Sequence, residues 1–152
     1  MQTNVLSNME ILGRMGEKYV SNYLARNGVI VEQALDHYDS EKDMIGDGLT
    51  IEVKTHVPFV KAKAFGINEK QLRKCKSVDR LFFINVPAPS HTFEWEGWLM
   101  EVDPKSFTYD KYKTKDGRIM VRIPMEQPAV TPVHKLDEDI TKQMLKYTRS
   151  EY

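Results

Sequence analysis

The stretch that decides the fold reads DMIGDGLTIEVKT, residues 43–55, where two short strand-forming runs flank the dipeptide Asp47-Gly48. Asp-Gly between alternating residues is the strongest short-range signal for a β-hairpin, and it favours a type I′ turn. With Asp47 and Gly48 at the centre of that turn, residues paired across the two strands have numbers that sum to 95. The sequence therefore predicts an antiparallel hairpin with a defined register.

This register predicts a cluster of charged side chains on one face of the hairpin. Asp43 lies directly opposite Glu52, and Lys54, two residues further along, shares their face. Two opposed carboxylates repel each other unless a cation lies between them, and oxygen ligands favour Mg²⁺ or Mn²⁺ over zinc. We therefore expect a Mg²⁺ site, in which Mn²⁺ substitutes, with Lys54 placed to stabilise charge on an attacked phosphate. The alternative is an edge strand whose polar face is simply solvated.

The sequence outside the hairpin predicts helices and strands around a central sheet. Helix and strand signals place the elements at 8–26, 29–33, 69–77, 81–86, 97–102, 118–123 and 138–145, with Ser7, Asn68 and Asp137 as helix caps and a turn at 116–117. This order predicts an α/β fold with a central mixed β-sheet flanked by helices.

These residues resemble the PD-(D/E)XK nuclease superfamily, which includes restriction enzymes, archaeal Holliday-junction resolvases and phage or homing endonucleases. The resemblance covers residues 12–86, about half of the chain. Asp43 stands at the position of the family's strand aspartate, and Glu52 and Lys54 at the positions of its Glu-x-Lys. Lys42 stands where the proline that names the family would be.

The resemblance implies two further site residues. Glu17, in GRMGE at residues 13–17, resembles the acidic residue on the first helix of the junction resolvases and is implied as a third metal ligand. Helical geometry places it at the margin of the apolar face, and the alternative is a solvated glutamate that pairs with Arg14 or Ser21. Gln71 resembles a glutamine that several subfamilies place near the lysine. His56 and Cys75 are expected to be structural.

The family implies a restriction-endonuclease-like core and a Mg²⁺-dependent DNA endonuclease that hydrolyses phosphodiester bonds. We expect one nuclease domain over residues 1–152, with a core at about 7–102 and a C-terminal elaboration at about 103–152. Sequence-specific and branch- or junction-specific cutting both stay open, and so does RNA as a substrate. A homodimer or a higher symmetric homo-oligomer is expected by analogy. The alternative function is a non-catalytic nucleic-acid-binding or assembly protein that keeps the nuclease fold.

The charge distribution is compatible with a DNA partner although the net charge is zero. Between Lys54 and Arg80 the chain has eight basic residues and two acidic ones, an excess of six positive charges. Within this segment the residues expected to contact the phosphate backbone are Lys61, Lys63, Lys70, Arg73 and Lys74. The alternative is an ordinary solvated helix face.

Composition excludes several other classes of protein. The chain has 152 residues, 41% of them hydrophobic, and one cysteine, so a disulfide scaffold and general disorder are both excluded. No apolar run approaches the roughly 20 residues that a membrane helix needs, and the N-terminal residues do not resemble a secretion signal. We expect no membrane partner and a cytoplasmic location, and the gene could belong to a phage or mobile element.

Overall fold

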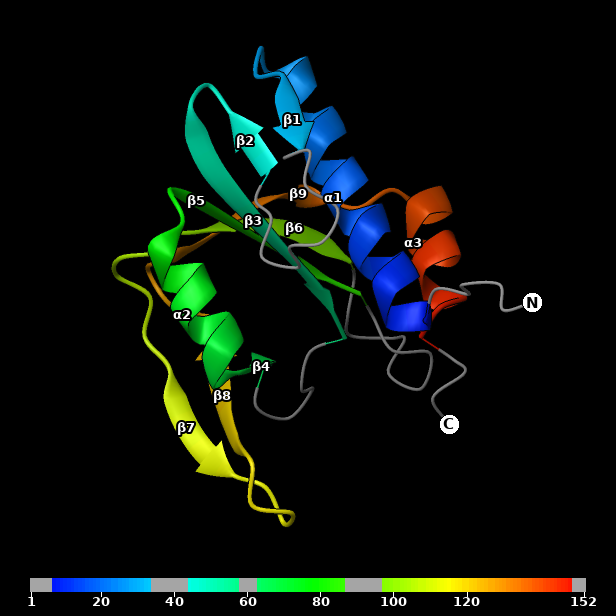
Figure 1. Ribbon diagram of the computed structural model, residues 1–152. Coiled ribbons are helices and arrows are strands. Elements are labelled where there is room, and N and C mark those ends of the chain that lie inside the picture. Colours follow the sequence, from blue (N-terminus) through cyan, green and yellow to red (C-terminus); the bar gives the residue numbers. More distant parts are fainter. Residues whose placement is uncertain (1–6, 34–43, 58–62, 87–96, 149–152) are drawn as a thin grey trace, which may run out of the picture.

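The computed structural model describes residues 7–33, 44–57, 63–86 and 97–148. It contains helices α1 (Asn8–Arg26), α2 (Glu69–Ser77) and α3 (Glu138–Leu145), and strands β1 (Val31–Gln33), β2 (Met44–Gly46), β3 (Leu49–His56), β4 (Ala64–Asn68), β5 (Arg80–Asn85), β6 (Trp98–Val102), β7 (Asp110–Lys113), β8 (Ile119–Pro124) and β9 (Val130–Lys135). The predicted α/β class with a central mixed sheet flanked by helices is confirmed (Figure 1).

The strands form two sheets. The central sheet has the order β1-β2-β3-β5-β6-β9, in which β3 and β5 are parallel and the other neighbours are antiparallel. A second sheet has the order β4-β8-β7 and is antiparallel throughout. The sequence predicted the central sheet. It did not predict strands β4, β7 and β9, and it did not predict the second sheet.

The helices begin where the sequence predicted. The side chain of Ser7 accepts a hydrogen bond from the backbone N–H of Glu10, 3.2 Å away, and caps α1. Asn68 caps α2, and Asp137 caps α3 by accepting from the backbone N–H of Ile140 at 2.9 Å. Each cap satisfies a backbone donor that has no partner within its own helix, so a local sequence signal is enough to set these boundaries.

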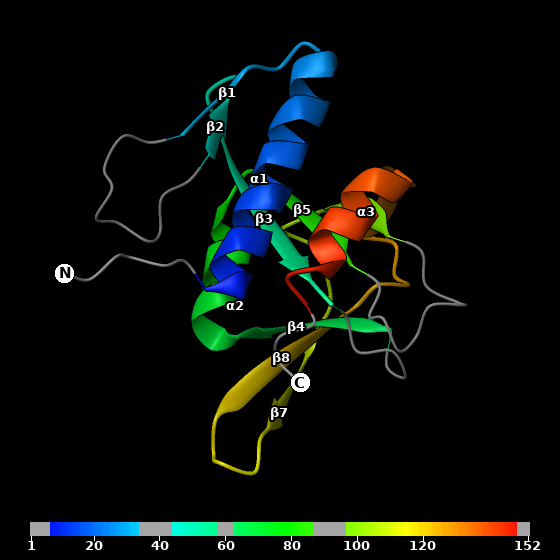
Figure 2. The ribbon, with the colours of Figure 1, turned by 90° about the vertical axis from the view of Figure 1, so that its right-hand side faces the viewer.

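Two apolar cores lie on opposite faces of the central sheet. Helices α1 and α3 cover one face, where Leu24, Phe82 and Met144 are buried together. Helix α2 and the second sheet cover the other face, where the rings of Phe65 and Phe83 meet at 4.4 Å between centroids. Figure 2 shows α1 and α3 along one layer and the second sheet extending away from them.

Elements from both halves of the chain share each sheet. Strand β9 pairs with β6 at the edge of the central sheet, and β8 pairs with β4 in the second sheet. Leu136 and Met144 belong to the same core as Leu12 and Val20 of α1. The segment after residue 102, expected as an elaboration of a core at about 7–102, therefore contributes a strand to the central sheet and a helix to one of its faces.

Candidate active site

The site is built on the hairpin of β2 and β3, whose turn and register agree with the prediction. Asp47 and Gly48 have φ values of 52° and 75°, the left-handed conformation at both central positions that a type I′ turn requires. Met44 pairs with Ile51, and Gly46 pairs with Leu49, so the paired numbers sum to 95.

Asp43, predicted to face Glu52, lies outside the described residues, so its place in the site stays a prediction. The described part of the register ends one pair earlier, at Met44 and Ile51. Of the three residues predicted to bind the metal, the structure describes Glu17 and Glu52.

Glu52 and Lys54 lie together on the α2 side of the central sheet. In the parallel pairing of β3 with β5, Glu52 is the partner of Leu81 and Lys54 is the partner of Phe83, and both of these apolar residues belong to the α2-side core. The Lys54 ammonium lies 3.9 Å from a Glu52 carboxylate oxygen, and the side chains are only 16% and 15% exposed. Water screens this largely buried ion pair less than it would screen an exposed one.

Glu17 approaches this pair from α1. Burial is the main cause of the raised pKa of its carboxyl group; the nearby Glu52 carboxylate raises it further, and Arg14 and Lys54 lower it. The structure therefore brings the predicted helix acid within electrostatic reach of Glu52 and Lys54. Arg14, which sequence analysis named as an alternative partner, also acts on Glu17: its positive charge lowers the pKa of the carboxyl group.

A glycine that sequence analysis did not single out sets how closely α1 approaches the site strand. A Cβ atom on Gly16 would lie 1.8 Å from the side-chain oxygen of Thr55, so any larger residue here must displace Thr55 or the helix. Gly16 immediately precedes Glu17, and Thr55 immediately follows Lys54. The close contact thus sets how near this turn of α1, which also carries Glu17, lies to β3. The signal in the sequence was the second glycine in the motif of residues 13–17.

Two neutral groups lie close to the charged pair. Burial, helped by the nearby Lys54 charge, lowers the pKa of His56 to about 4, so its imidazole is neutral at neutral pH. Burial raises the pKa of the Cys75 thiol to about 12, and both Lys54 and Glu52 influence it. Cys75 is fully buried in α2, which agrees with the structural role expected for it.

Gln71 has a structural task in α2. Its side-chain oxygen accepts a hydrogen bond from the backbone N–H of Asn68 at 3.0 Å, while the Asn68 side chain accepts from the backbone N–H of Gln71 at 2.8 Å. This reciprocal pair is a capping box. The side-chain oxygen of Gln71 is thus already used at the helix terminus, and its catalytic role stays a prediction.

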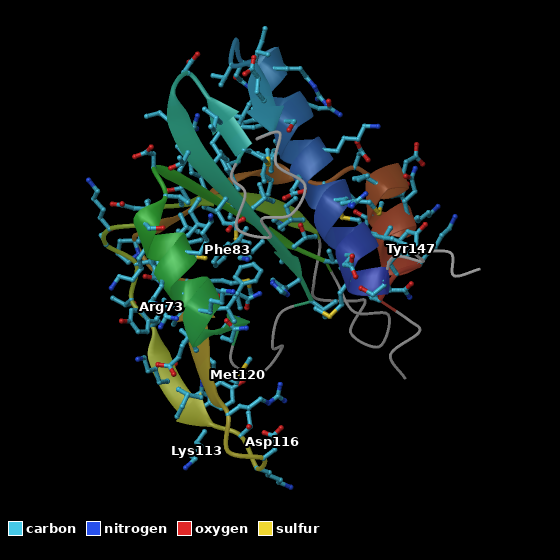
Figure 3. All side chains as sticks on the ribbon, in the orientation of Figure 1. Arg73, Phe83, Lys113, Asp116, Met120 and Tyr147 are labelled. Atoms are coloured by element: carbon cyan, nitrogen blue, oxygen red, sulfur yellow. The ribbon has the colours of Figure 1, made fainter. Side chains whose placement is uncertain are left out.

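The basic segment is less positive in three dimensions than along the sequence. Lys63 pairs with Glu126 at 3.4 Å, and Arg80 makes two hydrogen bonds to Glu101 at 2.8 and 2.9 Å. Both acids come from outside the segment. Lys70, Arg73 and Lys74 lie on α2, with Arg73 on its outer side in Figure 3, and Lys61 lies outside the described residues.

A cavity lies apart from this cluster and includes none of Glu17, Glu52 and Lys54 in its lining. It has a volume of about 950 Å³ and is lined by Tyr23, by residues of β6 and β9, and by the acids Asp79, Glu101 and Asp103. These carboxylates would repel a phosphate group. The cavity is therefore not a candidate for binding DNA.

No protein-family model, curated protein or solved structure matches the chain. Within the described ranges, no three His, Cys, Asp or Glu side chains are grouped as a metal site. No helix in those ranges is long and apolar enough to cross a membrane.

Proposed function

We propose that this protein is a metal-dependent DNA endonuclease with a restriction-endonuclease-like core. The observation that supports the proposal is the pairing of the largely buried side chains of Glu52 and Lys54 on one strand face, with the acid Glu17 within electrostatic reach. Charged groups buried this far are costly, so a solvated edge strand does not account for them.

The residues present fit a hard divalent cation. Glu17 and Glu52 offer carboxylate oxygens. Burial is the main cause of the raised pKa of Glu17 and the Glu52 charge adds to it, and a bound cation would offset both effects. We propose these two glutamates and Asp43 as the ligands of Mg²⁺ or Mn²⁺. When bound, the ion would act as a Lewis acid on the phosphate and lower the pKa of its water.

The chain's own groups would do the remaining work. Lys54 would stabilise negative charge that develops on the attacked phosphate, because its ammonium lies beside the proposed metal ligand Glu52, 3.9 Å away. Lys70, Arg73 and Lys74 on α2 would hold the DNA backbone. Two copies paired by a two-fold axis would place one site on each DNA strand.

The experiment is plasmid nicking with Mg²⁺ by the wild type, by Lys54→Ala and by Lys142→Ala. Lys142 is an exposed lysine on α3, so its variant controls for the loss of one positive charge. We expect Lys54→Ala to cut about 10²–10³-fold more slowly and Lys142→Ala to cut at the wild-type rate. Absence of cutting by the wild type on supercoiled, linear and branched DNA, with Mg²⁺ or Mn²⁺, would contradict the proposal.

A further inference from the structure

The hairpin of β7 and β8 projects from the body of the protein. Both ribbon views show it extending beyond α2 and away from the layer of α1 and α3 (Figures 1 and 2). Near the body, Val121 and Ile123 of β8 are fully buried against the core. Further out, Ile119 is 39% exposed, so the outer part of the hairpin has left the core.

The tip of the hairpin is held in one conformation by local hydrogen bonds. The backbone N–H of Thr114 donates to the carbonyl of Arg118 at 2.8 Å, and Gly117, with φ at +88°, donates to the carbonyl of Thr114 at 3.0 Å. The Thr114 hydroxyl bonds to Asp116, which also pairs with Arg118 at 2.9 Å. An ordered tip loses little conformational entropy when it binds a partner.

Most charges on the hairpin are neutralised within the protein. Arg122 pairs with Asp110 at 2.6 Å, and Lys111 of β7 pairs with Glu69 of α2 at 3.0 Å. The latter pair links the hairpin to the first turn of α2.

Two lysines near the tip differ from these paired charges. Neither Lys113 nor Lys115 has an ion-pair partner among the residues that the structure describes. Figure 3 shows Lys113 projecting outward near the outer end of the hairpin. Because Lys113 pairs with Ile119 across the strands, these two side chains share the hairpin face that adjoins α2.

We propose that this hairpin binds duplex DNA by entering the major groove, with Lys113 and Lys115 on the phosphates and Ile119 toward the base edges. A two-stranded β-ribbon fits the major groove of B-form DNA, which is about 12 Å wide, whereas that of A-form RNA is too narrow and deep for side chains to read. The two unpaired cations complement the phosphate charge. The inference rests on the proposed function for its choice of DNA, but it concerns binding and involves none of Glu17, Glu52 and Lys54.

The test measures binding in EDTA, where cutting does not interfere, by fluorescence anisotropy of a labelled DNA duplex of mixed sequence over a range of salt. We compare the wild type with the double variants Lys113→Ala/Lys115→Ala and Lys113→Arg/Lys115→Arg, and with Lys142→Ala as control. Log affinity falls as log salt rises, and each lost phosphate contact makes this slope less steep by about 0.9. The slope of the double alanine variant should therefore be less steep than that of the wild type by about two. The arginine variant and Lys142→Ala should keep the wild-type slope.

An unchanged slope in the double alanine variant, or an equal loss in Lys142→Ala, would overturn the inference. An equal loss of binding to duplex RNA would overturn the groove assignment. A wild type that cuts DNA while the double alanine variant binds normally removes the hairpin inference alone. A wild type that never cuts, but whose DNA binding depends on Lys113 and Lys115, removes the nuclease proposal alone.

Discussion

At the scale of single residues, His56 reports the electrostatic environment of the candidate site. Its imidazole is two residues from Lys54 on the same strand, and burial and that lysine both disfavour the imidazolium form. The folded protein therefore releases the His56 proton at a pH where the unfolded chain still holds it. This difference links the stability of the fold to pH.

We predict that the free energy of unfolding rises with pH between about 4, the pKa of His56 in the folded protein, and 6.5, its ordinary value. In this window the unfolded chain binds more protons than the folded one, so raising the pH favours folding, and the contribution levels off above the window. Urea unfolding across this range should show a shallower slope for His56→Gln. In Lys54→Met the rise should begin at a higher pH, because one cause of the lowered pKa is gone. Equal slopes in wild type and His56→Gln would contradict the assignment.

At the scale of elements, the contact between α1 and β3 depends on one missing side chain. The Thr55 hydroxyl is buried without a hydrogen-bond partner among the described residues, directly beneath Gly16. We predict that Gly16→Ala lowers the free energy of unfolding by about 1–3 kcal/mol, because the new methyl group must displace Thr55 or the helix. Chemical denaturation measures this change.

Gly13 of the same helix provides a matched control for that variant. A Cβ atom on Gly13 would meet nothing within 4 Å, so Gly13→Ala should stabilise the protein by about 0.5–1 kcal/mol through helix propensity alone. Adding Thr55→Ala to Gly16→Ala should restore part of the loss, because the two residues are in contact. Equal effects of the two glycine substitutions would show that the helix and strand do not meet as described.

Elements set by local signals could be predicted, whereas those set by distant partners could not. The hairpin register follows from Asp47-Gly48, and the start of α2 follows from Asn68 and Gln71, because turns and caps are local interactions. Strand β9 contains Pro132 and has only one buried residue, Val130, so its sequence gives a weak strand signal. It forms because an edge strand tolerates proline while β6 supplies the hydrogen-bonding partner. Strand β7 is largely charged and likewise depends on β8.

The candidate site follows the same division. Glu52 and Lys54 could be placed on one face from strand alternation alone, and the structure brings them together. The approach of Glu17 to them depends on how α1 packs against β3. The helical pattern placed Glu17 at the margin of the apolar face, but it could not predict this packing. The use of Gln71 in a capping box could have been foreseen, because Asn68 stands three residues before it.

At the scale of the whole molecule, the C-terminal elements complete the core that supports the site strand. Strand β9 pairs with β6 along its length, and α3 buries Met144 beside Phe82 and Leu99 of the central sheet. The same core contains Ile51 and Val53, whose neighbours on β3 are Glu52 and Lys54. The face of β3 opposite the candidate site is thus covered by an apolar core. Residues of α1 and of α3 both contribute to this core.

We predict that a chain ending at residue 129, which lacks β9 and α3, does not unfold cooperatively. Loss of β9 and α3 would leave β6 with one neighbouring strand and expose Phe82 and Leu99. The apolar burial that remains would not offset the conformational entropy lost when the sheet is ordered. Urea unfolding followed by circular dichroism should give a broad transition with a small m-value. Asp137→Ala is the matched control: it removes only the cap of α3, and should cost about 1 kcal/mol with an unchanged m-value. A sharp, cooperative transition in the shortened chain would instead show that residues 7–129 fold alone and that β9 and α3 are additions to a complete domain.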